Sequence, residues 1–114
     1  MRAPAIPLDW PFRTASRHIQ CAPHLWHVQD IGTGPVVLLI HGAGGGTHSF
    51  RHLIPLLSPR FRLIALDLPG QGFTLQGSPR RCSLDAMAED IATLVTSKGW
   101  APCAIVGHSA GAAL

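Results

Sequence analysis

Tyrosine is absent from these 114 residues, and lysine occurs only once, at Lys98. Charged residues make up 13% of the chain and hydrophobic residues 46%, a balance typical of a globular protein and not of a disordered one. The formal net charge of +3 is spread along the whole length, and no basic block is longer than the pair Arg80-Arg81. Because no aromatic residues alternate with the basic ones, the sequence does not predict nucleic-acid binding.

Cysteine is scarce and irregularly placed, at Cys21, Cys82 and Cys103. An odd number without C-x-x-C spacing argues against a disulfide framework or a zinc site and favours reduced thiols in the cytoplasm. Histidine is more frequent, but five of the seven histidines lack the spacing of metal ligands: His18, His24, His27, His48 and His52. We therefore expect neither a metal site nor a cofactor.

Long hydrophobic runs are also missing. The longest apolar run covers residues 36–40, which is far too short to span a bilayer. The first residues lack the apolar region of a secretory signal, because Pro4 and Pro7 interrupt them. We expect a soluble, cytoplasmic protein without a transmembrane segment.

The first third of the chain predicts an arm and an antiparallel pair of strands. Residues 1–14 contain three prolines, which cannot pair regularly in a sheet, so we expect an extended arm pinned to the body by Trp10 and Phe12. Residues 16–21 and 25–31 suit two strands at the edge of a sheet, and the turn at residues 32–35 follows them.

The remainder alternates strands with helices. Residues 36–40 form an unbroken apolar run, typical of a strand buried on both faces, and residues 61–66 resemble it. A helix is expected over residues 48–57, kinked or shortened by Pro55.

A second helix is expected between an N-cap at Ser83 and a stop at Gly99, and a last strand over residues 103–106. Six residues should form the apolar face of this helix: Leu84, Met87, Ala88, Ile91, Leu94 and Val95. This alternation of strands and helices predicts an α/β fold with a mostly parallel sheet.

The last strand leads into the motif Gly107-His108-Ser109-Ala110-Gly111. A G-x-S-x-G pattern between a strand and a helix is the signature of a nucleophile elbow, in which a tight turn exposes the serine hydroxyl. Gly107 and Gly111 leave room for that turn, since a Cβ there would collide with the adjoining strand or helix. We predict that Ser109 is a catalytic nucleophile.

A glycine-rich loop follows the first buried strand, at His41-Gly42-Ala43-Gly44-Gly45-Gly46. Acyl transfer needs N–H donors for a negatively charged oxygen, and we expect these from the backbone of Ala43 and Ala110, with His41, Gly42 and Gly44 supporting the loop. A flexible turn or a phosphate cradle is the alternative. The spacing does not match a dinucleotide fingerprint, and the Gly-Lys-Ser/Thr of a P-loop is missing.

Asp67 ends the second buried strand and begins Asp67-Leu68-Pro69-Gly70-Gln71-Gly72. It could serve as a catalytic acid, but we favour a structural aspartate that binds the backbone of its own turn. His41 and His108 flank the predicted site. Neither is expected to be the catalytic base, because both partners follow the nucleophile in the order Ser…Asp/Glu…His.

These motifs together resemble the α/β-hydrolase family over nearly the whole chain. A narrower resemblance, to the magnesium chelatase accessory proteins of bacteriochlorophyll synthesis, rests on six segments: Asp9-Trp10-Pro11, Ala15-Ser16-Arg17, Gly32-Thr33-Gly34-Pro35, Thr47-His48-Ser49-Phe50, residues 67–74 and residues 107–113. Two departures bear on substrate fit. Gln71 stands where these proteins and many relatives carry histidine, and three glycines in succession follow Ala43.

The resemblance implies that residues 1–114 are the N-terminal portion of one hydrolase domain, without its lid, catalytic acid and catalytic histidine. It implies a serine hydrolase acting on a small-molecule substrate in or beside tetrapyrrole synthesis, with the fragment itself inactive. A dehalogenase is disfavoured because its nucleophile would be aspartate. The alternative is a non-catalytic accessory protein that uses the pocket to hold a tetrapyrrole or to assist magnesium chelatase subunits.

Overall fold

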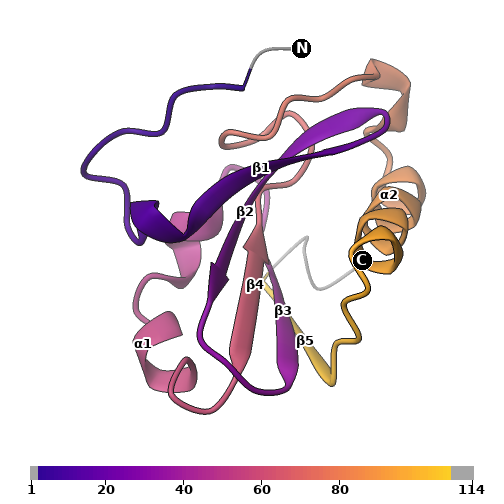
Figure 1. The fold of residues 1–114 in the computed structure, drawn as a ribbon. Helices are drawn as coiled ribbons and strands as arrows, with labels where there is room; N and C mark the ends of the chain where they lie inside the picture. Colours follow the sequence, from indigo (N-terminus) through magenta and orange to yellow (C-terminus); the bar gives the residue numbers. More distant parts are fainter. Residues whose placement is uncertain (1–2, 109–114) are drawn as a thin grey trace.

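The computed structural model describes residues 3–108, which form a five-stranded sheet with helices on both faces (Figure 1). The strands lie in the order β1-β2-β4-β3-β5. Their bounds are Ser16–Cys21 for β1, His24–Ile31 for β2, Val36–Ile40 for β3, Arg62–Leu66 for β4 and Ala104–Gly107 for β5. The predicted strands are all present, with bounds that differ by one residue at some ends.

The predicted antiparallel edge pair is confirmed. β1 pairs with β2 in antiparallel register, and β2 also runs antiparallel to β4, whereas β4, β3 and β5 are parallel. The turn between β2 and β3 requires glycine at residues 32 and 34, which have φ values of 87° and 122°. A Cβ on Gly32 would lie 2.4 Å from the carbonyl oxygen of Phe61, so the turn sits directly against the segment that leads into β4.

The continuous apolar runs of β3 and β4 are buried on both faces, as predicted. One face contributes to a core that α2 covers, formed by Trp26, Val28, Leu38, Ile40, Ile64, Leu66, Leu68, Met87, Ile91, Leu94 and Trp100. On the opposite face, Val37, Leu39, Leu63 and Ala65 of the strands pack against Phe50 and Ile54 of the segment between β3 and β4. The parallel strands β3 and β4 therefore lie between two packed apolar layers.

The helix α2, Leu84–Ser97, begins and ends where the sequence predicts. The hydroxyl of Ser83 accepts a hydrogen bond from the N–H of Ala86 at 3.1 Å. Gly99 has a φ of 68°, and the next N–H, of Trp100, donates to the carbonyl oxygen of Val95, which closes the helix in a Schellman motif.

One residue of the predicted apolar face of α2 is wrong. Leu84 is 46% exposed, while Ala86 and Asp90 are buried. Leu84 is the first residue of the helix, whereas the buried carboxylate of Asp90 is bound by His24 and Arg81. Spacing alone does not distinguish these environments.

The helix predicted over residues 48–57 is replaced by two short pieces, a 3₁₀ turn η2 at Thr47–Phe50 and the helix α1 at Ile54–Leu57. Pro55 lies in the first turn of α1, where its missing N–H breaks no hydrogen bond, so the proline starts this helix instead of kinking a longer one. Two further 3₁₀ turns lie in regions predicted as arm and loop, η1 at Arg13–Ala15 and η3 at Pro79–Arg81.

The arm is pinned to the body as predicted. The indole Nε1–H of Trp10 donates to the hydroxyl of Thr47 at 3.1 Å, and Phe12 packs against the core beside α1. Among the helices of residues 3–108, none is long and apolar enough to cross a membrane.

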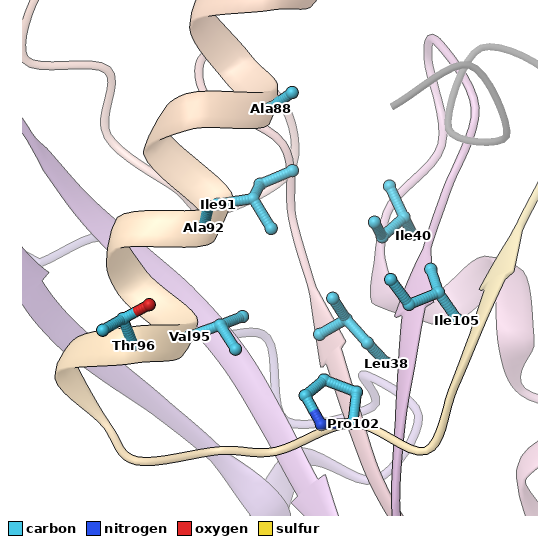
Figure 2. Close-up of a pocket in the computed structure, with 9 residues that line it drawn as sticks. All are labelled: Leu38, Ile40, Ala88, Ile91, Ala92, Val95, Thr96, Pro102 and Ile105. Carbon is cyan, nitrogen blue, oxygen red and sulfur yellow. The ribbon is translucent and has the colours of Figure 1, made fainter.

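An apolar groove runs between α2 and the β5 side of the sheet (Figure 2). The side chains of Ile91 and Val95 point into it from α2, and those of Leu38, Ile40 and Ile105 face them from β3 and β5. Its volume is about 350 Å³, and Ile105 is 62% exposed. β5 is the last strand of the sheet, so one of its edges is unpaired within the described residues.

A polypeptide of residues 1–114 alone should aggregate, or bind a hydrophobic dye without a cooperative melt. An unpaired edge strand beside an apolar groove can pair with another molecule and so promotes aggregation. Each large side chain left exposed to water loses about 1.5–3 kcal/mol of stabilisation from burial. Ile105→Thr should lower dye binding in the same polypeptide. Differential scanning fluorimetry checks both points, and a sharp transition from a soluble monomer would contradict this expectation.

Candidate active site

The glycine-rich loop and the end of β5 meet at the carboxyl edge of the parallel strands, because β3 pairs with β5 and brings Ile40 opposite Gly107. A cavity of about 320 Å³ lies between them and is lined by Gly42, Ala43, Gly44, Gly45, His48, Ser49 and His108. The predicted nucleophile Ser109, its neighbour Ala110 and Gly111 lie outside the described residues. His108 is the last described residue before them, and it lines this cavity.

The backbone N–H groups of the loop are almost all used internally. The four residues that follow Ala43 each donate to a protein acceptor: Gly44 to Oε1 of Gln71 at 2.8 Å, Gly45 to the carbonyl of Gly42 at 3.0 Å, Gly46 to Oγ of Ser49 at 3.2 Å and Thr47 to Oδ1 of Asp67 at 2.7 Å. The N–H of Ala43 has no such partner within residues 3–108, and Ala43 is exposed. This pattern disfavours a phosphate cradle, which needs several free N–H groups in succession.

His41 sets the direction of the Ala43 N–H. The N–H of Leu68 donates to Nε2 of His41 at 2.8 Å, so the ring proton is on Nδ1, which donates to the carbonyl oxygen of Gly42 at 2.5 Å. The N–H of Gly45 donates to the same oxygen. Since the C=O and N–H of a trans peptide point in opposite directions, fixing this carbonyl aims the Ala43 N–H away from His41.

His41 is therefore held in the loop, as the sequence predicts, and both of its nitrogens are occupied. The backbone N–H of His108 donates to the carbonyl of Ile40 at 3.0 Å, which fixes its main chain, while its side chain is exposed. No group of three or more His, Cys, Asp or Glu side chains within residues 3–108 is arranged to hold a metal ion.

Asp67 is fully buried and binds the backbone of its own turn, as we favoured from the sequence. Its Oδ2 accepts from the N–H of Phe73 at 2.9 Å, and its Oδ1 accepts from the N–H of Thr47. A Cβ on Gly46 would lie 2.9 Å from Oδ1, and a Cβ on Gly72 would lie 2.3 Å from Oδ2. Two glycines are thus needed for the carboxylate to fit between the two loops.

His27 completes this network, and sequence reasoning missed it. Its Nδ1 is 2.6 Å from Oδ2 of Asp67, and its Nε2 is 2.9 Å from Oγ of Ser16. This chain of Ser, His and Asp has the connectivity of a catalytic triad. However, His27 and Asp67 are both fully buried, and Oδ2 of Asp67 already accepts a hydrogen bond from another N–H. We therefore assign these three side chains a structural role, in which they tie β1 and β2 to the loop after β4.

Gln71 is a second residue whose contact the sequence did not reveal. Its Oε1 accepts a hydrogen bond from the N–H of Gly44, and this bond joins the loop after β4 to the glycine loop. Gly44 has a φ of 78°. The sequence marks Gln71 only as a departure from its relatives. In the structure it is a direct support of the predicted oxyanion loop.

A further cluster anchors the segment that follows these loops. The N–H of Gly77 donates to Nδ1 of His24, so Nε2–H of His24 donates to Asp90 at 2.8 Å, and Arg81 binds the same carboxylate at 2.9 Å. Burial alone would raise the pKa of Asp90, but the hydrogen bonds from Arg81 and His24 hold it below its ordinary value. This cluster ties the middle of α2 and the η3 turn before it to β2.

Comparison with known proteins gives one family. A sequence model described as the alpha/beta hydrolase fold matches residues 35–114. The magnesium-chelatase 30 kDa subunit of Rhodobacter capsulatus is 45% identical over 112 residues, and epoxide hydrolase 3 of Siraitia grosvenorii is 39% identical over 88 residues. The crystal structure of epoxide hydrolase VrEH1 from Vigna radiata superposes with a TM-score of 0.78 at 34% identity.

The matches cover most of this chain but only part of each relative. The match to the chelatase subunit includes 96% of this chain and 39% of the subunit. The match to epoxide hydrolase 3 includes 75% of this chain and 28% of that enzyme, and the superposition on VrEH1 includes 86% of this chain and 32% of VrEH1. The chain thus spans about two fifths or less of the length of these proteins. The predicted fold and the predicted family resemblance are confirmed by these matches and by the sheet.

Asp67→Asn should lower the free energy of unfolding of the full-length protein by about 3 kcal/mol or more. An amide in this place turns an N–H₂ toward buried N–H donors and leaves them without an acceptor. Asp85→Asn is the matched control, because Asp85 is exposed in the first turn of α2 and its charge is worth about 0.3–1 kcal/mol. Urea denaturation measures both changes, and equal losses would contradict the central role of Asp67.

Proposed function

The chain belongs to the α/β-hydrolase family, and on that premise we propose that its complete form is a serine hydrolase that cleaves an ester or amide by acyl transfer. Ser109 is the nucleophile in this proposal. The N–H groups of Ala43 and Ala110 hold the oxyanion, and residues beyond Leu114 supply the histidine base and its acid. Gly107 and Gly111 permit the tight turn, and His41, Gly42 and Gly44 support the loop.

The observation that carries this proposal is the state of the Ala43 N–H. It is the one N–H between residues 43 and 47 without a protein acceptor in the described part of the chain, and Ala43 lines a cavity that His108 also lines. Ser109 follows His108 directly in the sequence, and this adjacency supports the pairing of the free donor with Ser109 in the proposed mechanism.

The chemistry follows from these positions. The Ser109 hydroxyl gives its proton to the base as its oxygen bonds to the substrate carbonyl carbon, and the carbonyl oxygen becomes negatively charged. Two preorganised N–H donors stabilise that charge where it develops. Collapse of the intermediate expels the protonated leaving group and leaves an acyl-serine ester. Water, activated by the same base, then releases the acid and restores the serine.

The serine favours acyl substrates over epoxides, although epoxide hydrolases are among the similar proteins. A serine that opened an epoxide would form an ether, which water cannot readily cleave. A carboxylate nucleophile would form an ester, which water can hydrolyse. Position 109 carries a hydroxyl and no carboxylate, so an alkyl-enzyme intermediate at this position would be a dead end.

The second candidate is a non-catalytic accessory role, which the 45% identity to a magnesium-chelatase 30 kDa subunit favours. In that case the pocket would hold a tetrapyrrole or assist chelatase subunits without turnover. The two candidates differ in what they require of Ser109. An accessory protein can work with alanine at this position, whereas a serine hydrolase cannot.

Ser109→Ala should abolish covalent labelling of the full-length protein by a fluorophosphonate probe, because the probe reacts only with an activated serine. Ser97→Ala, at the exposed C-terminal end of α2, is the matched control and should label like the wild type. Mass spectrometry of the labelled peptide measures the site. Undiminished labelling of Ser109→Ala would remove this serine from the mechanism, and an intact pathway phenotype in cells carrying the variant would support the accessory role.

Ala43→Pro should reduce turnover of an activated ester by the full-length protein about 100- to 1,000-fold, since proline deletes one oxyanion donor. Ala43→Ser keeps the N–H at the same position and should retain most of the activity. Steady-state kinetics on p-nitrophenyl butyrate, with circular dichroism to verify folding, gives both values. Normal turnover by a folded Ala43→Pro protein would show that the oxyanion site lies elsewhere.

A further inference from the structure

His48 lines the cavity beside the glycine loop, and its side chain is positioned by residues from separate parts of the chain. Its ring packs against Trp10 of the arm, with ring centroids 4.6 Å apart. Trp10 is itself held by its hydrogen bond to Thr47. On the other side, a Cβ on Gly46 would lie 3.1 Å from Nδ1 of His48, so the absence of a side chain there makes room for the imidazole.

Neither nitrogen of this ring has a hydrogen-bond partner among residues 3–108. Nδ1 of His48 is buried without a hydrogen-bond partner, and no side-chain hydrogen bond of His48 occurs within residues 3–108. A buried N–H without an acceptor is rarer and costlier than a buried lone pair without a donor. The ring proton therefore belongs on Nε2, the nitrogen that is not enclosed, and the imidazole offers a donor.

The rest of the cavity wall offers donors as well. It is lined by Ala43, whose N–H is free within residues 3–108, by His108 and by Ser49, whose O–H can still donate, and none of its lining residues is acidic. The one carboxylate close behind the loop, Asp67, already accepts from backbone and side-chain donors. A ligand that fits this wall carries acceptor oxygens in addition to the scissile carbonyl.

We propose that His48 is a substrate-contacting residue that donates from Nε2–H to a second oxygen on the acyl part of the substrate. The class of substrate is then an acyl compound with a carboxylate or a second carbonyl beyond the scissile bond. Trp10 and Gly46 act as positioning residues for this contact. The assignment rests on the proposed hydrolase function for its kinetic consequence, but the contact itself does not require turnover.

The kinetic test compares two esters of equal chain length in the full-length protein, p-nitrophenyl valerate and mono-p-nitrophenyl glutarate. His48→Phe keeps the packing against Trp10 and removes the donor, so kcat/KM for the glutarate ester should fall about threefold to tenfold relative to the valerate ester. His48→Gln retains a donor and should restore much of this preference. His52→Gln, an exposed histidine outside the cavity, should change neither value. An equal effect of His48→Phe on both esters would overturn the proposal.

A binding test separates this inference from the proposed chemistry. The Ser109→Ala full-length protein, with ¹⁵N-labelled histidine, is titrated with monomethyl glutarate while imidazole ¹H–¹⁵N signals are recorded. A saturable shift of the His48 Nε2 signal is expected. No shift at His48 would overturn the contact, whatever the labelling of Ser109 shows. If the wild-type protein hydrolyses neither ester, the hydrolase proposal fails, and a saturable shift would still establish His48 as part of a binding site.

Discussion

The structure depends on one buried carboxylate. Asp67 accepts hydrogen bonds from the backbone of Thr47 and Phe73 and pairs with His27, while its own carbonyl oxygen accepts from the hydroxyl of Thr74. A charge with no exposed surface is tolerated only when donors replace its water. Here those donors come from three different segments. The hydrogen bonds that satisfy the carboxylate therefore also bring these segments together at the site.

This constraint explains the composition of the two loops around it. Side chains at residues 46 and 72 would occupy the space of the carboxylate, which accounts for two of the glycines without any appeal to flexibility. The glycine loop is instead rigidly held, since its N–H groups from residue 44 to residue 47 all have acceptors. Within the described residues, the N–H of Ala43 is the one left free between residues 43 and 47, and its direction is fixed by the loop. A donor fixed in advance stabilises a developing negative charge effectively.

The arm and the first two strands contribute to the site although they are remote from it in sequence. Trp10 places His48 beside the cavity, and β2 supplies the histidine that pairs with Asp67. The antiparallel pair is therefore more than an edge of the sheet. It supports the loops of the parallel part through the contact between His27 and Asp67, which lie 40 positions apart in the sequence.

The sequence by itself determined the elements whose signals are local. The apolar runs of β3 and β4, the cap at Ser83 and the stop at Gly99 follow from side-chain size, backbone freedom and hydrogen bonding within a few residues, and the structure confirms them. The glycine loop and the G-x-S-x-G motif likewise indicated the family, because tight turns at strand ends admit few residue types.

Only the tertiary structure decided the contacts that join separate segments. The partners of His27 and Gln71 lie 40 and 27 residues away, and no spacing rule links residues brought together by the strand order β1-β2-β4-β3-β5. The predicted helix over residues 48–57 failed for a related reason. Thr47, just before this segment, is bound to Asp67 and Trp10, and Pro55 then starts a separate helix. Periodicity records which residues are apolar, whereas long-range hydrogen bonds decide where a segment must bend.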